Sequence, residues 1–243
     1  MKIIASDFDG TLNYNGKVSD EDRKAIDLFR REGNKFGIVT GRDLEAALRF
    51  FYNFKLKCDF VISCTGAVIT DFEGKIIYSR KAKTEGFLAD IIDKAISLGA
   101  GLFVVTDGLR RYHIDVHGKI PYDLALFPEF NHCNTWFESD ACAAEFVKYV
   151  KENHPDKISA YRNGNSVDMP PAGVSKTSGI YEYARNFKGA EIYTAGDNYN
   201  DIPMLTEFCG FAVSNALDKV KEKAKHNCDR ICDMIEYIMK EEI

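Results

Sequence analysis

Short apolar runs recur along the chain, and stretches with helical patterning separate several of them. The runs that indicate buried strands are KIIAS (2–6), KFGIV (35–39), DFVIS (59–63), EIYTA (191–195) and GFAVS (210–214). Helices are predicted between Ser19 and Gly33, over 42–54 and over 174–187, and a hairpin over 68–79. Apolar strands that alternate with helices favour a parallel sheet covered on both faces. The pattern therefore predicts an α/β fold built on a doubly wound parallel sheet.

The middle of the chain follows a different pattern. Two predicted helices, 84–98 and 139–153, are each followed by a pair of strands. The strands span 102–106 and 110–116 in the first set, and 157–162 and 165–169 in the second, where Asn163-Gly164 is a hairpin signal. We therefore expect an α+β domain over 83–170, made of two helix-strand-strand units. It would be inserted into a discontinuous α/β domain over 1–82 and 171–243.

The composition disfavours several classes of protein. The 243 residues, 45% of them hydrophobic, are enough for a packed core in one large domain or two modest ones. The formal net charge is −5 and no Lys/Arg run stands out, so we expect no nucleic-acid partner. No apolar stretch reaches the roughly 18 residues of a membrane span, and the start, MKIIASDFDG, does not indicate a signal peptide. We expect no membrane partner, and a monomer or homodimer.

Seven cysteines are scattered along the chain, at positions 58, 64, 133, 142, 209, 228 and 232. An odd count without a CxxC pair favours free thiols and a cytoplasmic location. His226, Cys228 and Cys232 cluster in the last part of the sequence, and two interpretations are open: a soft-metal site, or small buried side chains on a helix. The second is favoured, because structural zinc usually takes four ligands at closer spacing.

Two carboxylates, Asp7 and Asp9, follow directly behind the first apolar run, in IIASDFDGT. In a doubly wound sheet, ligands bind beyond the carboxyl ends of the strands. Two acids there repel each other unless a cation lies between them, and Mg²⁺ suits the role because it prefers carboxylate, water and phosphate oxygens. The pair therefore predicts a magnesium site at this edge of the sheet.

Other predicted strands end in compatible groups. The segment TGR (40–42) follows the second run, and GDNYND (196–201), with two further acids, follows the fourth. Lys176 lies in GVSKTSG at the start of a predicted helix. Taken singly, each group could be a turn, a cap or a solvated side chain. Their conjunction at successive strand ends predicts a metal-assisted phosphate site.

Four of these segments are similar to the motifs of a known family. DFDGT (7–11), TGR (40–42), GVSK (173–176) and GDNYND (196–201) resemble, in this order, the motifs of the haloacid dehalogenase-like phosphohydrolases, in particular the Cof-type hydrolases with a class II (IIB) cap. The resemblance covers nearly the whole chain, and the predicted insert lies where class II caps occur. It implies a Rossmannoid core. It also implies phosphatase activity on a small phosphorylated metabolite, such as a sugar phosphate or a similar phosphomonoester, through a phosphoaspartate.

The chain departs from the family pattern at three places. Asn198 stands where the fourth motif often has glycine, and we expect the loop to keep its shape because asparagine tolerates a positive φ. Residues 64–67, CTGA, stand where the family often has Asn-Gly-Ala, so the polar contact of that asparagine is not expected. The insert is also short for a Cof-type cap.

The resemblance also implies roles for individual residues. Asp7 is expected to be the nucleophile, and Asp9 the general acid and base. The expected ligands of Mg²⁺ are Asp7, Asp197, the backbone carbonyl of Asp9 and Asp201, which would either bind through water or orient Asp197 and Lys176. The groups expected on the phosphoryl oxygens are Thr40 and Lys176, and the further substrate contacts are Thr11, Gly41, Arg42 and Asn200.

The inserted domain is expected to select the organic part of the substrate. The candidate contacts are basic side chains on or beside its predicted strands, which could equally be solvated strand positions: Arg110, Arg111, His113, His117 and Arg162.

Two rival functions are weighed beside the phosphatase. A phosphomutase of the same superfamily would return the phosphoryl group to the sugar instead of releasing it. A binding protein on the same scaffold would need no chemistry, but it should have lost part of the motif set. Asp7, Asp9, Lys176 and Asp197 are all present, which disfavours the binding protein.

Overall fold

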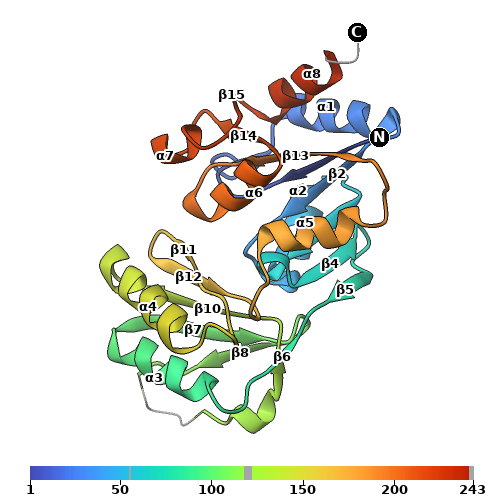
Figure 1. Ribbon diagram of the computed structural model, residues 1–243. Helices are drawn as coiled ribbons and strands as arrows, with labels where there is room; N and C mark the ends of the chain where they lie inside the picture. The colour runs from blue at the N-terminus through green and yellow to red at the C-terminus, as the bar shows by residue number, and fades with distance from the viewer. Residues whose placement is uncertain (55, 118–121, 241–243) are drawn as a thin grey trace.

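The chain folds around two β-sheets, which lie in the upper and lower halves of the molecule in Figure 1. The computed structural model describes residues 1–54, 56–117 and 122–240. Over these residues the larger sheet has eight strands and the smaller sheet has five. A short ladder of β6 (Ala82–Lys83) with β9 (Glu129–Phe130) forms a third, two-stranded sheet.

The larger sheet is parallel over six of its strands. Across the sheet, the order is β15 (His226–Cys228), β14 (Cys209–Val213), β13 (Glu191–Gly196), β1 (Lys2–Ser6), β2 (Lys35–Val39), β3 (Phe60–Ser63), β4 (Val68–Asp71) and β5 (Ile76–Ser79). The last two strands are antiparallel and form the predicted hairpin. β1 pairs with β2 on one side and with β13 on the other, so the strand order reverses at β1. Open α/β sheets bind their ligands at such a point.

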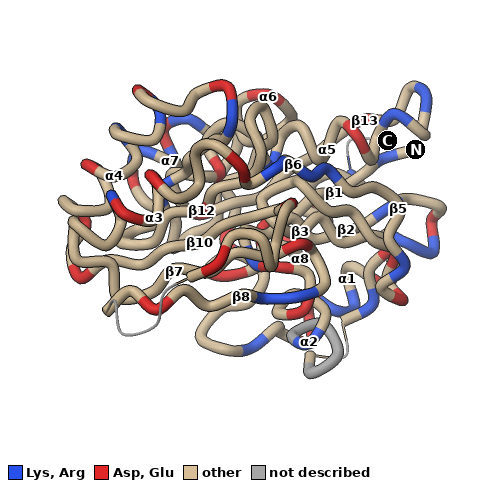
Figure 2. The backbone as a smooth tube through the Cα atoms, turned by 90° about the horizontal axis from the view of Figure 1, so that it is seen from below, with Lys and Arg blue, Asp and Glu red and all other residues tan. Residues whose placement is uncertain are grey.

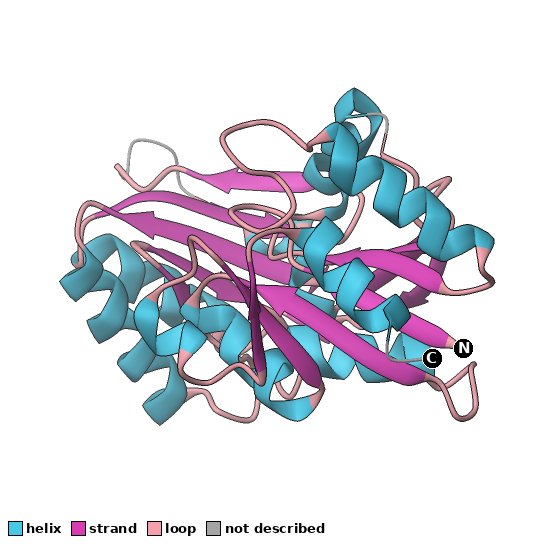
Figure 3. Ribbon diagram, turned by 90° about the horizontal axis from the view of Figure 1, so that it is seen from above, coloured by secondary structure: helices cyan, strands magenta, loops and turns pink. Residues whose placement is uncertain are grey.

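Helices cover both faces of this sheet (Figures 1 and 3). One face carries α1 (Asp20–Arg31), α2 (Leu44–Phe54), α7 (Asp218–Lys221) and α8 (Ile231–Lys240), and the other carries α5 (Lys176–Ala184) and α6 (Ile202–Glu207). The residues of β1 explain why both faces are covered. Ile4 packs into one apolar cluster, whereas Ile3 and Ala5 point the other way and pack into a second. The predicted α/β class with a doubly wound core is confirmed.

The smaller sheet is antiparallel and carries its helices on one face. Its order is β11 (Tyr161–Asn163), β12 (Ser166–Met169), β10 (His132–Phe137), β7 (Ala100–Thr106) and β8 (Arg111–Ile114). α3 (Leu88–Ser97) and α4 (Asp140–Asn153) cover one face and bury residues such as Phe103 and Phe146. Alternate residues of the strands therefore point to the opposite face, part of which lines a cavity between the two sheets.

The predicted elements occur in the structure, and the differences have local causes. The Ser19 hydroxyl accepts a hydrogen bond from the Asp22 N–H at 3.0 Å and begins α1, as predicted. The strand predicted over 157–162 is shorter and starts later, at Tyr161–Asn163, because residue 157 ends a turn and Ile158 forms only an isolated bridge with Pro171. β10 and the elements after β14 are not among the elements predicted from the sequence.

Asn198 keeps its loop for a different reason from the one expected. Its φ is −125°, so this position needs no left-handed backbone. The side chain instead caps the turn that follows, by accepting a hydrogen bond from the Tyr199 N–H at 2.7 Å. Asparagine is suitable here because of its capping oxygen.

The expectation that His226, Cys228 and Cys232 lie on one helix is wrong, because His226 and Cys228 lie on β15 and only Cys232 lies on α8. The His226 ring stacks on Phe211 with centroids 4.7 Å apart and lies 5.0 Å from the Tyr237 ring. All seven cysteines are free. In the described part of the chain, the group that could hold a metal ion lies elsewhere and consists of acids.

Charge is mixed over the molecule. Lys and Arg lie in short stretches interspersed with Asp and Glu (Figure 2). Among the described helices, none combines the length and the apolar character that crossing a bilayer requires.

Candidate active site

The carboxyl ends of neighbouring strands bring the predicted site residues together. Asp7 continues β1, and its N–H donates to the Ala195 carbonyl at 2.9 Å. Thr40 continues β2, and its N–H donates to the Ile62 carbonyl at 2.8 Å. These bonds extend the parallel ladders, so the residues that follow β1, β2 and β13 share one edge of the sheet.

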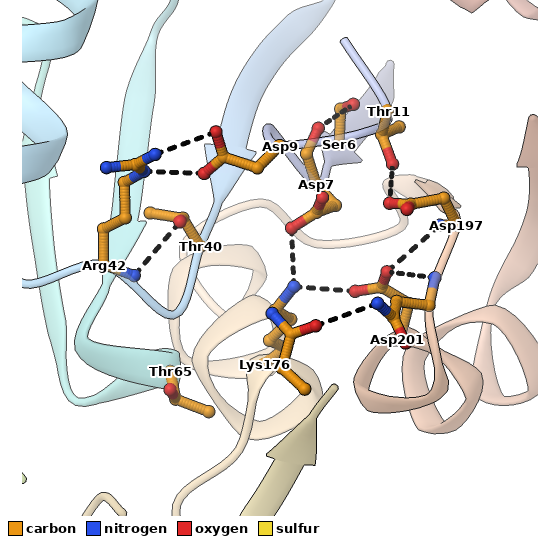
Figure 4. A network of polar contacts seen from close by, with 12 residues as sticks. Ser6, Asp7, Asp9, Thr11, Thr40, Arg42, Thr65, Lys176, Asp197 and Asp201 are labelled. Carbon is orange, nitrogen blue, oxygen red and sulfur yellow. Dashed lines mark hydrogen bonds and ion pairs between the residues drawn. The ribbon is translucent and has the colours of Figure 1, made fainter. Parts of the chain in front are cut away.

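Lys176 lies between two acids at this edge (Figure 4). Its Nζ is 2.6 Å from Asp7 Oδ1 and 2.7 Å from Asp201 Oδ1. All three side chains are buried, and the two carboxylates offset the cost of burying the ammonium. Burial alone would lower the pKa of Lys176, but the charges of Asp201 and Asp7 outweigh it and raise the pKa. Lys176 therefore stays protonated.

Close packing of α5 against the turn after β3 places Lys176. That turn, residues 64–66, has positive φ throughout, with values of 53°, 54° and 109°. A Cβ on Gly66 would lie 2.0 Å from the Ser175 carbonyl oxygen, and a Cβ on Gly179 would lie 2.8 Å from the Gly66 Cα. Glycine at both positions permits this approach. The segments CTGA and GVSKTSG therefore pack as one unit that directs Lys176 at Asp7.

Three acids form a compact cluster that fits a divalent metal ion. Oxygens of Asp7, Asp197 and Asp201 lie within 4.8 Å of one another. Asp201 is held by the N–H groups of Asp197 and Asn198, which each donate to its Oδ2 at 3.1 Å. The Thr11 hydroxyl donates to Asp197 Oδ1 at 2.8 Å. Hydrogen bonds thus hold the cluster in a shape that presents hard oxygen ligands.

Crowding changes the ionisation of these acids. Burial raises the pKa of Asp7 well above its usual range, and the charges of Asp201 and Asp197 add to the rise although Lys176 opposes it. Burial and Asp201 likewise raise the pKa of Asp197 to about 6, against the hydrogen bond from Thr11. A bound cation relieves such repulsion.

The Asn200 side chain adds a second indication of a hydrated ion. Its Oδ1 is buried and accepts no hydrogen bond from the described residues. It lines the same cavity as the acid cluster. A metal-bound water donates hydrogen bonds, so it would satisfy an acceptor at this position.

The Asp9 carboxylate points toward Arg42 rather than into the acid cluster (Figure 4). Arg42 Nε and Nη2 donate to its two oxygens at 2.6 and 3.0 Å. The Arg42 N–H donates to Thr40 Oγ1 at 3.1 Å, which fixes the TGR turn. A bidentate guanidinium–carboxylate pair orients both side chains. Asp9 is 42% exposed, so it stays accessible to a substrate.

A cavity of about 420 Å³ lies between the two sheets. The predicted site residues that line it are Asp7, Asp9, Thr40, Gly41, Arg42, Lys176, Asp197, Asn200 and Asp201. Thr11 is not part of the lining and acts through its hydrogen bond to Asp197. The smaller sheet completes the cavity with residues from all five of its strands.

Of the five basic residues suggested for the insert, all of which are described, Arg111 alone lines the cavity. Its Nε lies 2.9 Å from Asp43 Oδ2. Asp43 Oδ1 also accepts a hydrogen bond from the Ala46 N–H at 2.9 Å in the first turn of α2. The ion pair therefore joins β8 of the smaller sheet to the residue that follows the TGR segment of the larger sheet.

The other four basic residues lie outside the cavity. Arg110 pairs with Asp107 at 2.9 Å, and Arg162 lies 4.0 Å from Asp140. The remaining two, His113 and His117, are exposed. These four positions are solvated strand or loop positions, the alternative that the sequence analysis weighs.

Polar residues of the smaller sheet that line the cavity are not predicted from the sequence. They are Thr106, His132, Asn134, Asn163, Ser166 and Asp168. The signal lies in HCNTWF (132–137), where His132 and Asn134 face the cavity while Cys133 and Thr135 are fully buried. Polar residues at every second position of a strand mark one face of a sheet.

Comparison with known proteins identifies the family. The family model of the haloacid dehalogenase-like hydrolases matches residues 4–233. The chain belongs to this family. A relative from Bacillus subtilis, 5-amino-6-(5-phospho-D-ribitylamino)uracil phosphatase, is 26% identical over 247 residues, which cover 94% of this chain and 90% of the relative.

Solved structures share the fold. A haloacid dehalogenase-like hydrolase from Bacillus subtilis, 21% identical, has a TM-score of 0.84 and matches over 98% of this chain and 100% of its own. A sugar phosphatase of subclass IIB, also 21% identical, has a TM-score of 0.78 and matches over 98% of this chain and 99% of its own. The expectation of an enzyme of this family that hydrolyses phosphate esters is confirmed.

Proposed function

We propose that the chain is a Mg²⁺-dependent phosphatase that hydrolyses a small phosphorylated metabolite through a phosphoaspartate on Asp7. The observation that carries the proposal is the position of Asp7, at the end of β1, in contact with Lys176 and within the acid cluster. Attack by a carboxylate on phosphorus divides hydrolysis into two easier steps. The Lys176 ammonium is positioned to stabilise charge on the phosphoryl oxygens.

The donor set supports Mg²⁺. Carboxylates beside an orphaned amide oxygen suit a hard cation that keeps part of its water shell. When bound, Mg²⁺ neutralises charge on the phosphoryl group. The groups proposed to hold it are Asp7, Asp197, Asp201 and the backbone carbonyl of Asp9.

Asp9 is proposed as the general acid and base. It would give a proton to the leaving alkoxide and then take one from the attacking water. Arg42 orients the Asp9 carboxylate, and Thr40 fixes the backbone of Arg42. Thr40 and Gly41 are proposed to contact the phosphoryl group from the same turn, and Asn200 from the opposite loop.

The cavity supports a small substrate. Its volume of about 420 Å³ lies in the usual range for metabolite sites. We infer a sugar phosphate or similar phosphomonoester, which is in line with the names of the sugar phosphatase and the ribitylaminouracil phosphatase that resemble this chain. The lining from both sheets supports residues 83–170 as a cap domain over a catalytic domain of 1–82 and 171–243. Seven free thiols favour the cytoplasm.

Asp7→Asn tests the covalent mechanism. The amide keeps the shape of the side chain but is a poor nucleophile, so turnover of p-nitrophenyl phosphate should fall roughly a thousandfold or more. Asp20→Asn is the matched control, because Asp20 is 86% exposed on α1 and lies outside the cavity. Radiolabelled phosphate should be trapped on the wild-type protein and not on Asp7→Asn. Retained turnover in a folded Asp7→Asn protein would exclude this mechanism.

Chelation tests the metal. Removal of divalent cations should abolish turnover, and Mg²⁺ should restore more of it than Ca²⁺, which takes about 6–8 ligands in a looser geometry. Mg²⁺ should also raise the melting temperature of the wild-type protein more than that of Asp197→Asn. Full activity in excess chelator is the result that excludes a metal role.

A further inference from the structure

Asp168 is an acid of the cavity that the proposed chemistry does not use. It lies on β12 of the smaller sheet and is 6% exposed. Its Oδ1 accepts a hydrogen bond from Asn134 Nδ2 at 2.9 Å and lies 3.4 Å from His132 Nε2. Its Oδ2 accepts no hydrogen bond from any residue that the structure describes. Because Asp168 lines the cavity, this oxygen is available to accept a hydrogen bond from a ligand.

The neighbours of Asp168 fix its direction. His132 Nε2 also lies 3.3 Å from Thr65 Oγ1, on the turn after β3, so the histidine bridges the two sheets. The Oδ2 atom comes so close to the TGR turn that a Cβ on Gly41 would lie 2.5 Å from it. Asp168 Oδ2 therefore lies beside the turn that is proposed to hold the phosphoryl group.

Asp168 differs from most acids of the cavity in that no Lys or Arg lies beside it. Three sets of ion pairs account for the Lys and Arg residues among the described lining: Lys176 with Asp7 and Asp201, Arg42 with Asp9, and Arg111 with Asp43. Asp197 belongs to the proposed metal site. Asp168 thus lacks a Lys or Arg partner within the described lining, where each such cation already faces an acid. A second anionic group on the substrate would find no uncommitted counter-charge.

We propose that Asp168, oriented by Asn134 and His132, binds hydroxyl groups of the leaving group and restricts the enzyme to phosphomonoesters of uncharged polyols. The inference rests on the proposed phosphatase function and assigns the residue that selects its substrate. A hydroxyl donates to Oδ2, whereas a carboxylate or second phosphate meets an uncompensated charge in a poorly screened site. Sugar bisphosphates, which a mutase would have to bind, are rejected for the same reason.

Two esters that differ in one charged group test the inference: a hexitol 6-phosphate and the hexonate 6-phosphate of the same configuration. The wild-type kcat/KM for the hexitol ester should exceed that for the hexonate ester at least about tenfold. In Asp168→Asn, kcat/KM for the hexitol ester should fall about tenfold because the charged acceptor is gone. The preference should shrink to about threefold or less, because the repulsion is gone as well.

Asp140→Asn is the matched control. It removes the same group from the same sheet-and-helix unit, but Asp140 is 68% exposed and lies outside the cavity. The control should keep the wild-type preference between the two esters. Asp168→Ser repeats the test with a smaller neutral side chain, so that the result does not depend on how Asp168→Asn folds.

Three results would overturn the inference. The first is equal hydrolysis of both esters by the wild-type enzyme. The second is that both Asp168 variants keep the preference of the Asp140→Asn control. The third is that both variants lower the two kcat/KM values in parallel. Chelator-sensitive turnover of p-nitrophenyl phosphate that depends on Asp7 reports separately on the proposed function. If that turnover persists while the charge preference is independent of Asp168, this inference fails and the phosphatase proposal stands.

Discussion

The two sheets contribute to one cavity in different ways. In the larger sheet, the site residues stand where strands end, so each motif is a run of neighbouring residues such as DFDGT or TGR. In the smaller sheet, they stand within strands at alternate positions, and no run of neighbours forms. The first arrangement holds several groups around one phosphorus atom. The second spreads contacts over a surface, which suits recognition of a larger organic group.

Of three substitutions that compare the two sheets, Lys176→Gln should give the largest effect, because Lys176, at the start of α5, contacts two acids of the strand-end arrangement. Lys176 separates Asp7 and Asp201, and without its charge the two buried acids repel each other. We expect kcat to fall at least about a hundredfold for aryl and sugar esters alike. Steady-state kinetics would measure this, with Lys188→Gln as the exposed control. An effect confined to sugar esters would contradict the assignment of phosphoryl chemistry to the larger sheet and of substrate recognition to the smaller sheet.

Arg111→Gln should give an intermediate effect, because it loosens the contact between the sheets. The Arg111–Asp43 pair is half-buried, because the Asp43 side chain is only 9% exposed whereas that of Arg111 is 32% exposed. Loss of the pair should lower kcat/KM for a sugar phosphate about five- to tenfold, mainly through KM. Arg110→Gln is the matched control, because the adjacent Arg110 is 70% exposed and pairs within its own turn. Equal effects of the two substitutions would show that the Arg111 contact has no special role.

Arg162→Gln should give the smallest effect. The sequence suggests a substrate contact, but the side chain lies beside Asp140 outside the cavity. Exposed ion pairs contribute about 0–1 kcal/mol, so the relative kcat/KM values for a panel of sugar phosphates should stay within about twofold of wild type. A tenfold change in that preference would mean that alternate-strand positions beyond the cavity also reach the substrate.

The larger sheet and its site could be predicted because local rules decide them. Apolar runs without alternation indicate strands buried on both faces, and the structure has them within a residue or two. Once the strands are placed, the edge they share places Asp7, Thr40 and Asp197. The position of Lys176 does not follow from the strands alone, because it depends on the close approach of Gly179 to Gly66.

The smaller sheet could not be predicted as well, because long-range contacts decide it. β10 carries His132 and Asn134, which are not among the residues enriched in strands, yet it pairs with both β12 and β7 at the centre of the sheet. Burial of Cys133 and Phe137 under the helices stabilises it there. Asp168 and His132 come into contact only when these strands pair, so no run of neighbouring residues predicts the contact.

The insertion also bears on the order in which the molecule folds. β1 cannot complete its pairing until β13 is present, since Lys2 pairs with Glu191 at the far side of the whole insert. Closing so long a loop costs entropy and slows folding. The ladders Ala82–Phe130 and Cys133–Met169 draw the two ends of the insert together. During synthesis the insert emerges before β13, so its early folding would turn a long closure into a short one.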